Sequence, residues 1–212
     1  MKIIALVCCM NVFTINAQIN DTPTKLEHYV LNSFTPGRVL LKSGEVLNQV
    51  LNYNMITKEM IFENNGAYLA IARPQDVDTI FLSDRKFVPA VGAFYEYLGG
   101  KSFPLFEEHT CSVKEQGVSN GIGTTNTTAA TPLKSLLNDG GAYKLKLPDE
   151  FQIIPRHTYL VFKNSQYIKV NNEQQLIRAF PDKKQVIRDW IKNNRTNFSN
   201  QQDVALLVQQ LQ

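Results

Sequence analysis

Residues 38–98 read RVLLKSGEVLNQVLNYNMITKEMIFENNGAYLAIARPQDVDTIFLSDRKFVPAVGAFYEYL, and this stretch decides the fold. Short apolar runs alternate along it with turn residues. The strongest signal is the sequence NNG at residues 64–66, between apolar runs at residues 60–62 and 68–71. Asn-Gly supplies the positive φ that a tight hairpin turn needs. Because parallel strands would need long crossovers, the stretch predicts an antiparallel β-meander.

The first 17 residues have the pattern of a secretory signal peptide. Lys2 precedes a short apolar segment at residues 3–10, and Ala17 is a small residue at the expected cleavage site. The segment is too short to cross a bilayer, and a buried N-terminal strand is the alternative. We therefore expect an exported protein, in the periplasm, associated with the outer membrane, or secreted.

Cleavage after Ala17 also limits the kinds of bonds and binding that the mature chain can form. It removes Cys8 and Cys9 and leaves Cys111 as the single cysteine, so an internal disulfide is excluded. The formal net charge of +3, without a Lys/Arg-rich run, gives no reason to expect nucleic-acid binding. No later apolar run reaches the roughly 20 residues of a membrane helix, so no transmembrane segment is predicted.

Three further segments follow from composition. Residues 18–37 are polar and read as an arm leading into a β-rich domain at residues 38–170. Within that domain, residues 115–132 are rich in Gly, Thr and Asn and have too little apolar surface to offset their ordering entropy. We expect a mobile loop there. It is either a flexible connection between strands or a lid over a ligand. Its glycines do not form a phosphate-binding loop.

The hydrophobic period changes in the C-terminal segment at residues 171–212. Asn172 with Gln175 predicts the cap of a first helix, and Ser199 with Gln202 that of the last. A helix between them is predicted to bury a stripe of Val186, Ile187, Trp190 and Ile191. The fold class is therefore α+β: a mostly antiparallel β-meander, as a sandwich or open barrel, followed by two or three helices packed on it.

Three features of the sequence carry a resemblance to known proteins. They are NAQ at residues 16–18, the meander at residues 37–97 with DRKF at 84–87, and FPDKK at residues 180–184 before a long helix. With these the chain resembles exported proteins of unknown function from Bacteroidota. The resemblance implies a compartment and a lineage, and it brings no active site with it.

Cys111 with His109 is the weak candidate for thiol chemistry. On one strand face these residues lie about 7 Å apart along the strand, whereas a nucleophile and its base need a hydrogen bond of about 3 Å. A lone cysteine is more often a small packed residue than a nucleophile. A buried thiol is the favoured interpretation.

The histidines and carboxylates do not predict a site either. His28, His109 and His157 lack the spacing of metal ligands. Glu107 and Glu108 are adjacent on a predicted strand and so face opposite sides, unlike the paired carboxylates of a glycosidase. The strand at residues 103–114 alternates without a cleanly apolar face, which predicts partial exposure. We therefore expect no catalytic residue, cofactor or metal.

Aromatic residues give the best candidate for binding. Phe94, Tyr95 and Tyr97 surround Glu96, an arrangement that fits a sugar-binding surface. The competing interpretation is a sheet core, which such side chains fill more often because they bury large areas.

Two function classes follow. The first is a non-catalytic envelope or periplasmic interaction or structural module that binds a protein partner. The alternative is a glycan or small-ligand binding module that uses Phe94, Tyr95 and Tyr97 with residues 115–132 as a lid. A thiol enzyme based on Cys111 is a third and weaker hypothesis.

Overall fold

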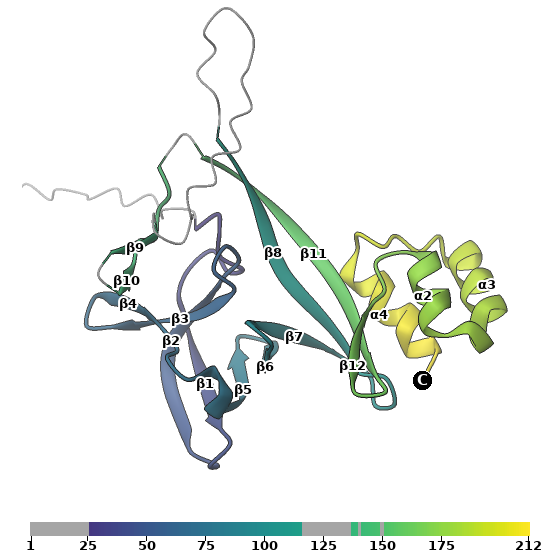
Figure 1. Cartoon of the computed structure of the whole chain (residues 1–212), viewed down its shortest axis with the longest axis horizontal. Coiled ribbons are helices and arrows are strands. Elements are labelled where there is room, and N and C mark those ends of the chain that lie inside the picture. The colour runs from purple at the N-terminus through teal and green to yellow at the C-terminus, as the bar shows by residue number, and fades with distance from the viewer. Residues whose placement is uncertain (1–25, 116–136, 140, 149–150) are drawn as a thin grey trace, which may run out of the picture.

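The computed structural model describes residues 26–115, 137–139, 141–148 and 151–212 (Figure 1). The predicted signal peptide at residues 1–17 and residues 116–132 of the predicted loop lie outside the described residues. Helices and strands are named below as in Figure 1.

The described strands are β1 (Thr35–Leu41), β2 (Val46–Asn54), β3 (Glu59–Asn64), β4 (Ala67–Ala70), β5 (Val77–Leu82), β6 (Arg85–Ala90), β7 (Ala93–Gly99), β8 (Leu105–Glu115), β9 (Asn138–Asp139), β10 (Ala142–Tyr143), β11 (Phe151–Lys163) and β12 (Gln166–Lys169). The described helices are α2 (Glu173–Ala179), α3 (Lys184–Asn194) and α4 (Gln201–Gln210), with short 3₁₀ turns η1 (Pro74–Asp76) and η2 (Pro181–Lys183).

Ten of these strands form one open antiparallel sheet in the order β12-β11-β8-β7-β6-β5-β1-β2-β3-β4. With three helices near the C-terminus, this confirms the predicted α+β fold with a β-meander. The meander is interrupted once, because β1 lies between β2 and β5 and pairs with both. The predicted hairpin between β3 and β4 is confirmed: Asn65 and Gly66 have φ of 51° and 81°, as a two-residue turn requires.

The sheet curls around its own core at the end that contains β1 to β7. Tyr53 of β2 stacks on Phe87 of β6 with ring centroids 5.7 Å apart, although β5 and β1 lie between these two strands in the sheet order. Met60 and Phe94 are buried in the same cluster. The curl therefore creates a concave inner face without closing a barrel.

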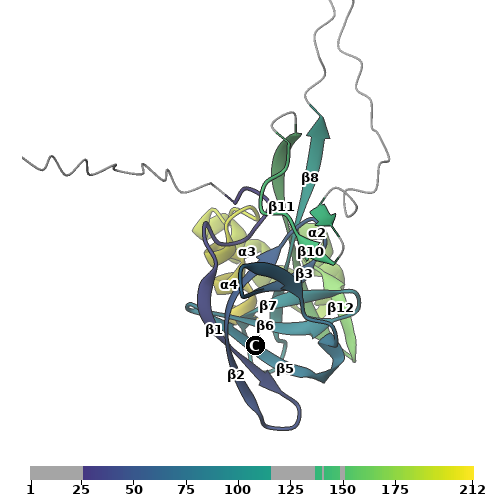
Figure 2. The ribbon, with the colours of Figure 1, turned by 90° about the vertical axis from the view of Figure 1, so that its left-hand side faces the viewer.

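Strands β8 and β11 form a long two-stranded ribbon that extends beyond the rest of the sheet (Figures 1 and 2). Their pairing runs from Phe151 opposite Glu115 to Val161 opposite Leu105. The apolar and charged residues alternate at residues 143–147, a pattern that predicts a strand, but the pairing there is limited to β10. The apolar run at residues 159–162 predicts a second strand, which as β11 begins well before it, at Phe151. Leu145 and Leu147 instead pack into a core cluster without forming a ladder.

The C-terminal helices cover the β12 end of the ribbon (Figure 1). Their apolar sides pack on Leu105, Tyr159 and Val161. Asn172 caps α2 by accepting a hydrogen bond from the Gln175 amide, as predicted, but the cap of α4 is Asn200 and not Ser199.

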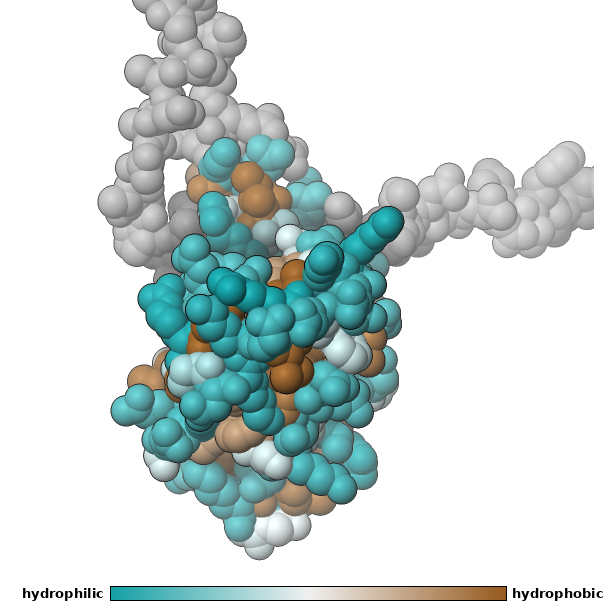
Figure 3. All heavy atoms as spheres, turned by 90° about the vertical axis from the view of Figure 1, so that its right-hand side faces the viewer, coloured by the Kyte–Doolittle hydropathy of each residue, from teal (hydrophilic) through white to brown (hydrophobic). Residues whose placement is uncertain are grey.

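The surface of this helical end is largely hydrophilic, with small apolar patches between polar side chains (Figure 3). Val186 is one of the exposed apolar residues and does not belong to the buried stripe predicted for α3. In the described part of the chain, no helix is long and apolar enough to span a membrane.

The segment before β1 is not merely the polar arm expected at residues 18–37. Leu26, His28 and Tyr29 are buried. The Asn52 side chain holds the segment against β2, donating to the Leu31 carbonyl at 2.8 Å and accepting from the Leu31 amide at 3.0 Å. This segment consequently becomes one wall of the cavity described next.

Candidate functional site

On the inner face of the sheet, a row of side chains that lie opposite one another on neighbouring strands contains two adjacent glutamates between aromatic residues. In the register, Phe87 lies opposite Glu96, Glu96 opposite Glu107, and Glu107 opposite Tyr159. Side chains directly opposite each other share a sheet face, and two like charges in this position are destabilising on their own. A positive or hydrogen-bonding group is needed between the glutamates.

His109 supplies that group. It follows Glu107 by two residues in β8, so both side chains point to the same face. Its Nε2 lies 2.6 Å from Glu96 Oε2 and its Nδ1 lies 3.3 Å from Glu107 Oε1. All three side chains are buried.

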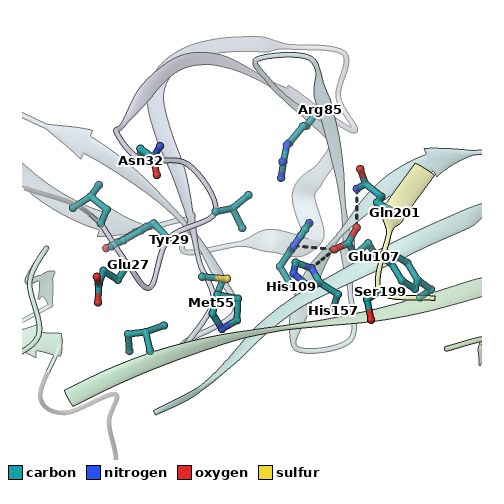
Figure 4. A pocket seen from close by; sticks show the side chains of 15 residues that line it. Glu27, Tyr29, Asn32, Met55, Arg85, Glu107, His109, His157, Ser199 and Gln201 are labelled. Carbon is teal, nitrogen blue, oxygen red and sulfur yellow. Dashed lines mark hydrogen bonds and ion pairs between the residues drawn. The ribbon is translucent and has the colours of Figure 1, made fainter. Parts of the chain in front are cut away.

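His157 completes the cluster from β11, where it lies directly opposite His109. Its Nδ1–H donates to Glu107 Oε1. Gln201, the first residue of α4, donates from Nε2 to Glu107 Oε2 at 2.7 Å. Arg85 Nη1 lies 3.4 Å from Glu96 Oε2. We call Glu96, Glu107, His109 and His157 the Glu–His cluster; the last three are labelled in Figure 4.

The two members of the Glu107–His157 pair have opposite shifts in pKa. Burial by itself raises the pKa of Glu107, but the hydrogen bond from His157 and the charges of His109 and His157 more than reverse this, and the pKa lies below its ordinary value. The same hydrogen bond raises the pKa of His157 against the effect of desolvation. The pair therefore favours an ionised carboxylate beside a protonated imidazole.

A cavity of about 430 Å³ opens beside the cluster. Parts of the chain that are distant in sequence contribute to its walls, among them Leu26 and Tyr29 before β1, Ile153 and His157 in β11, and Gln201 in α4. Figure 4 shows Tyr29, His157 and Gln201 around it. Glu107 and His109 also line it. The cavity thus offers a buried carboxylate, two imidazoles and apolar walls to a small ligand.

Three side chains of the cluster have the composition and spacing of metal ligands. Glu107, His109 and His157 each offer one donor atom, and these atoms lie within 4.8 Å of one another. Two nitrogens and one oxygen form a ligand set used by zinc.

The four residues predicted as a ligand surface are divided between the two faces of β7. Phe94 and Glu96 are buried on the inner face, where Phe94 fills the core and Glu96 joins the Glu–His cluster. Tyr95 and Tyr97 alternate with them and so point to the opposite face. The four therefore do not form one surface.

Tyr95 and Tyr97 instead join a larger aromatic group on the outer face. Tyr167 of β12 lies 5.1 Å from Tyr95, 5.4 Å from Phe106 and 5.0 Å from Phe162, measured between ring centroids. Tyr97 lies 5.6 Å from Phe106. Phe162 is 36% exposed and Tyr167 38% exposed. We call these five residues the outer aromatic face.

Cys111 lies two residues after His109 on β8 but does not line the cavity. Its side chain packs against the core inside the curl, and burial raises the pKa of the thiol to about 11. His109 is engaged by two glutamates instead. This geometry gives the predicted pair no hydrogen bond with which to activate the thiol.

Sequence reasoning missed Glu107, His157, Arg85 and Gln201 as site residues. The spacing of Glu107 and His109 was a usable signal, since residues two apart on a strand share a face. His157 had no such signal, because its position depends on the register between β8 and β11, which are far apart in the chain. The strand is buried at residues 105–107 and at His109 and is half-buried or exposed at residues 110–114, so the partial exposure expected for it holds for its second half and not around Glu107.

Comparisons of the chain with protein-family models, with curated proteins and with solved structures gave no significant match. What the cavity binds has to follow from its own residues.

Proposed function

We propose that this protein is a non-catalytic binding module that takes a small polar ligand into the cavity beside the Glu–His cluster. The observation that carries the proposal is the convergence of Glu107, His109 and His157 on one preformed cavity. Concave sites with a few convergent polar groups and perturbed pKa values are where proteins most often bind ligands.

The arrangement supports binding better than covalent catalysis. Nucleophilic catalysis needs a hydroxyl or thiol hydrogen-bonded to a base. Among the described residues lining the cavity, no hydroxyl or thiol is hydrogen-bonded to a histidine. Glu107 and His157 are instead paired with each other. Fixed charges of both signs favour a ligand that carries polar groups of its own.

The compartment and a macromolecular partner remain part of the proposal. The N-terminal sequence predicts export to the periplasm or outer membrane, and an envelope protein partner is the sequence-based expectation. The cavity favours a small ligand as the first function to test. An exported binding module could still present that ligand to a partner protein.

Thermal-shift screening of the purified protein tests the cavity. The panel contains amino acids, dicarboxylates, polyamines and oligosaccharides, in buffer with a chelator. We expect at least one class to raise the melting temperature of the wild type and not that of His157→Ala. Tyr167→Ala on the opposite sheet face is the matched control and should keep the response. A panel without any response, or a response retained in His157→Ala, would contradict the proposal.

The outer aromatic face favours a second candidate, glycan binding. Exposed Phe162 and Tyr167 extend the surface started by Tyr95 and Tyr97, and aromatic rings supply broad amphipathic contact area. Residues 116–132 of the proposed lid lie outside the described residues, so the face is considered without them. The same screen separates the two candidates, because oligosaccharide binding here should be lost in Tyr167→Ala and kept in His157→Ala.

A further inference from the structure

We propose that the ligand held first by the cavity is a divalent transition-metal ion, with Zn²⁺ the best match, bound by Glu107, His109 and His157. This inference rests on the proposed function, since it names the ligand of the same cavity. It assigns a role to three side chains for which the sequence predicted no metal binding.

The distances between donor atoms fit such an ion. Tetrahedral zinc with bonds of about 2.0–2.1 Å places neighbouring ligand atoms about 3.3 Å apart. His109 Nδ1 and Glu107 Oε1 are separated by 3.3 Å. His157 Nδ1 hydrogen-bonds the same Glu107 oxygen and has to move outward to admit the ion. Its side chain is 45% exposed and partly free to do so.

The surroundings of His109 orient it for metal binding. Histidines that bind metals usually donate their other ring N–H to a carboxylate, which fixes the tautomer. Glu96 Oε2, 2.6 Å from His109 Nε2, is placed to accept that hydrogen bond. In that tautomer the lone pair of Nδ1 faces Glu107 Oε1 at 3.3 Å, and either a proton on Nδ1 or a metal cation satisfies both atoms. On metal binding the cation takes the place of that proton.

Glu107 and Glu96 each have one further polar partner that fixes the orientation of the carboxylate. Gln201 donates to Glu107 Oε2, and Arg85 lies beside Glu96. Partners of this kind orient the ligating carboxylate and the carboxylate that supports the histidine. Three elements, β6, β7 and α4, thus support ligands that β8 and β11 carry.

The donor set also selects the metal. Two imidazoles and one carboxylate suit Zn²⁺ and its neighbours Co²⁺, Ni²⁺ and Cu²⁺, whereas Mg²⁺ and Ca²⁺ prefer oxygen ligands. With three protein ligands, a fourth coordination position is available to a water or to a donor atom from a molecule in the cavity. The small polar ligand of the proposed function then gains one bond to the metal in addition to its contacts with the cavity walls, so its binding does not depend on the metal.

Metal titration of the chelator-treated, full-length protein tests the inference. We expect one Zn²⁺ per chain by calorimetry and native mass spectrometry, and a visible absorption band of tetrahedral Co²⁺ on substitution. His157→Ala should weaken Zn²⁺ binding at least tenfold and abolish the Co²⁺ band. Glu96→Gln, which alters the support of His109, should weaken binding by roughly 10–100-fold.

Two controls exclude other donors. His28→Gln removes a buried histidine outside the cluster, and Cys111→Ser removes the thiol that does not line the cavity. Both should bind Zn²⁺ as the wild type does. Circular dichroism of each variant confirms that it is folded, and a His157→Asn variant repeats the test should His157→Ala unfold.

Several results would overturn the metal site. They are no uptake of any of the four transition metals, equal binding by His157→Ala, or binding of Ca²⁺ as tight as that of Zn²⁺. The chelator in the earlier screen separates the two proposals. A small molecule that binds there through His157, in a protein that takes up no metal, removes the metal inference and leaves the binding module in place.

Discussion

Glu107 illustrates at the scale of a single residue how this fold tolerates buried charge. An isolated buried carboxylate is costly, and its charge is retained only where partners compensate for lost water. Glu107 is 2% exposed and has His109, His157 and Gln201 around its two oxygens. Each partner comes from a different point in the chain. The buried charge of Glu107 is therefore compensated only in the assembled fold.

His28 predicts an acid-sensitive contribution to stability. Burial lowers the pKa of His28 from 6.5 to about 4, so the folded state keeps it neutral while the unfolded state takes up a proton below pH 6.5. Stability should fall as the pH drops through this window, by up to about 3 kcal/mol. Urea unfolding of the wild type and His28→Gln at several pH values should show a shallower fall in the variant. Parallel curves would contradict the assignment, because the Glu107–His157 pair is common to both.

Gly37 predicts a steric constraint in the central strand. A Cβ added there would lie 2.7 Å from the Phe81 carbonyl oxygen in the neighbouring β5. Because two backbones approach closely, Gly37→Ala should lower the free energy of unfolding by about 1–3 kcal/mol. Asn48→Ala, at an exposed position of β2, is the control and should change it by less than about 0.5 kcal/mol. Equal effects of the two substitutions would show that β1 and β5 can separate without cost.

At the scale of elements, the sequence correctly predicted the features that depend on a few neighbouring residues. The β3–β4 hairpin depends on two residues with positive φ, and α2 on an Asn172 side chain that reaches the Gln175 amide. Elements whose form depends on distant partners were predicted less well. The first half of β11 has no clean alternation, and it is a strand because β8 supplies its hydrogen bonds.

The start of α4 gives a prediction at this scale. Ser199 and Asn200 are both good capping residues, and the backbone places Asn200 so that its side chain accepts from the amides of Gln202 and Asp203. Asn200→Ala should therefore cost about 1 kcal/mol in chemical denaturation. Ser199→Ala should be close to neutral. A larger loss of stability in Ser199→Ala than in Asn200→Ala would instead support Ser199 as the cap, as predicted from the sequence.

At the scale of the whole molecule, residues of three core clusters line the cavity. Met55 belongs to the core inside the curl of the sheet, and Tyr159 to the core between the helices and the β12 end of the ribbon. Leu26, Tyr29 and Ile153 belong to a third core. Strands β8 and β11 carry Glu107 and His157 and contribute Leu105 and Tyr159 to the helical core, so the site and that core share the same two strands.

This arrangement predicts that the helices unfold together with the sheet. Leu207 is 0% exposed in the helical core, whereas its neighbour Leu206 is 55% exposed. Leu207→Ala should lower the free energy of unfolding by about 2–5 kcal/mol, and Leu206→Ala should have little effect. Fluorescence of Trp190 in α3 and far-ultraviolet circular dichroism should give the same urea midpoint. Separate midpoints would mean that the helices are an independent unit.

The antiparallel meander, the β3–β4 hairpin and the helical C-terminus could be predicted from the amino-acid sequence, because turn residues and hydrophobic periods act over a few neighbouring positions. The face of β7 that points into the core and the partners of Glu107 followed only from the assembled fold. Those depend on the register of strands that are distant in the chain, and a shift of one residue would send His157 to the opposite face of the sheet.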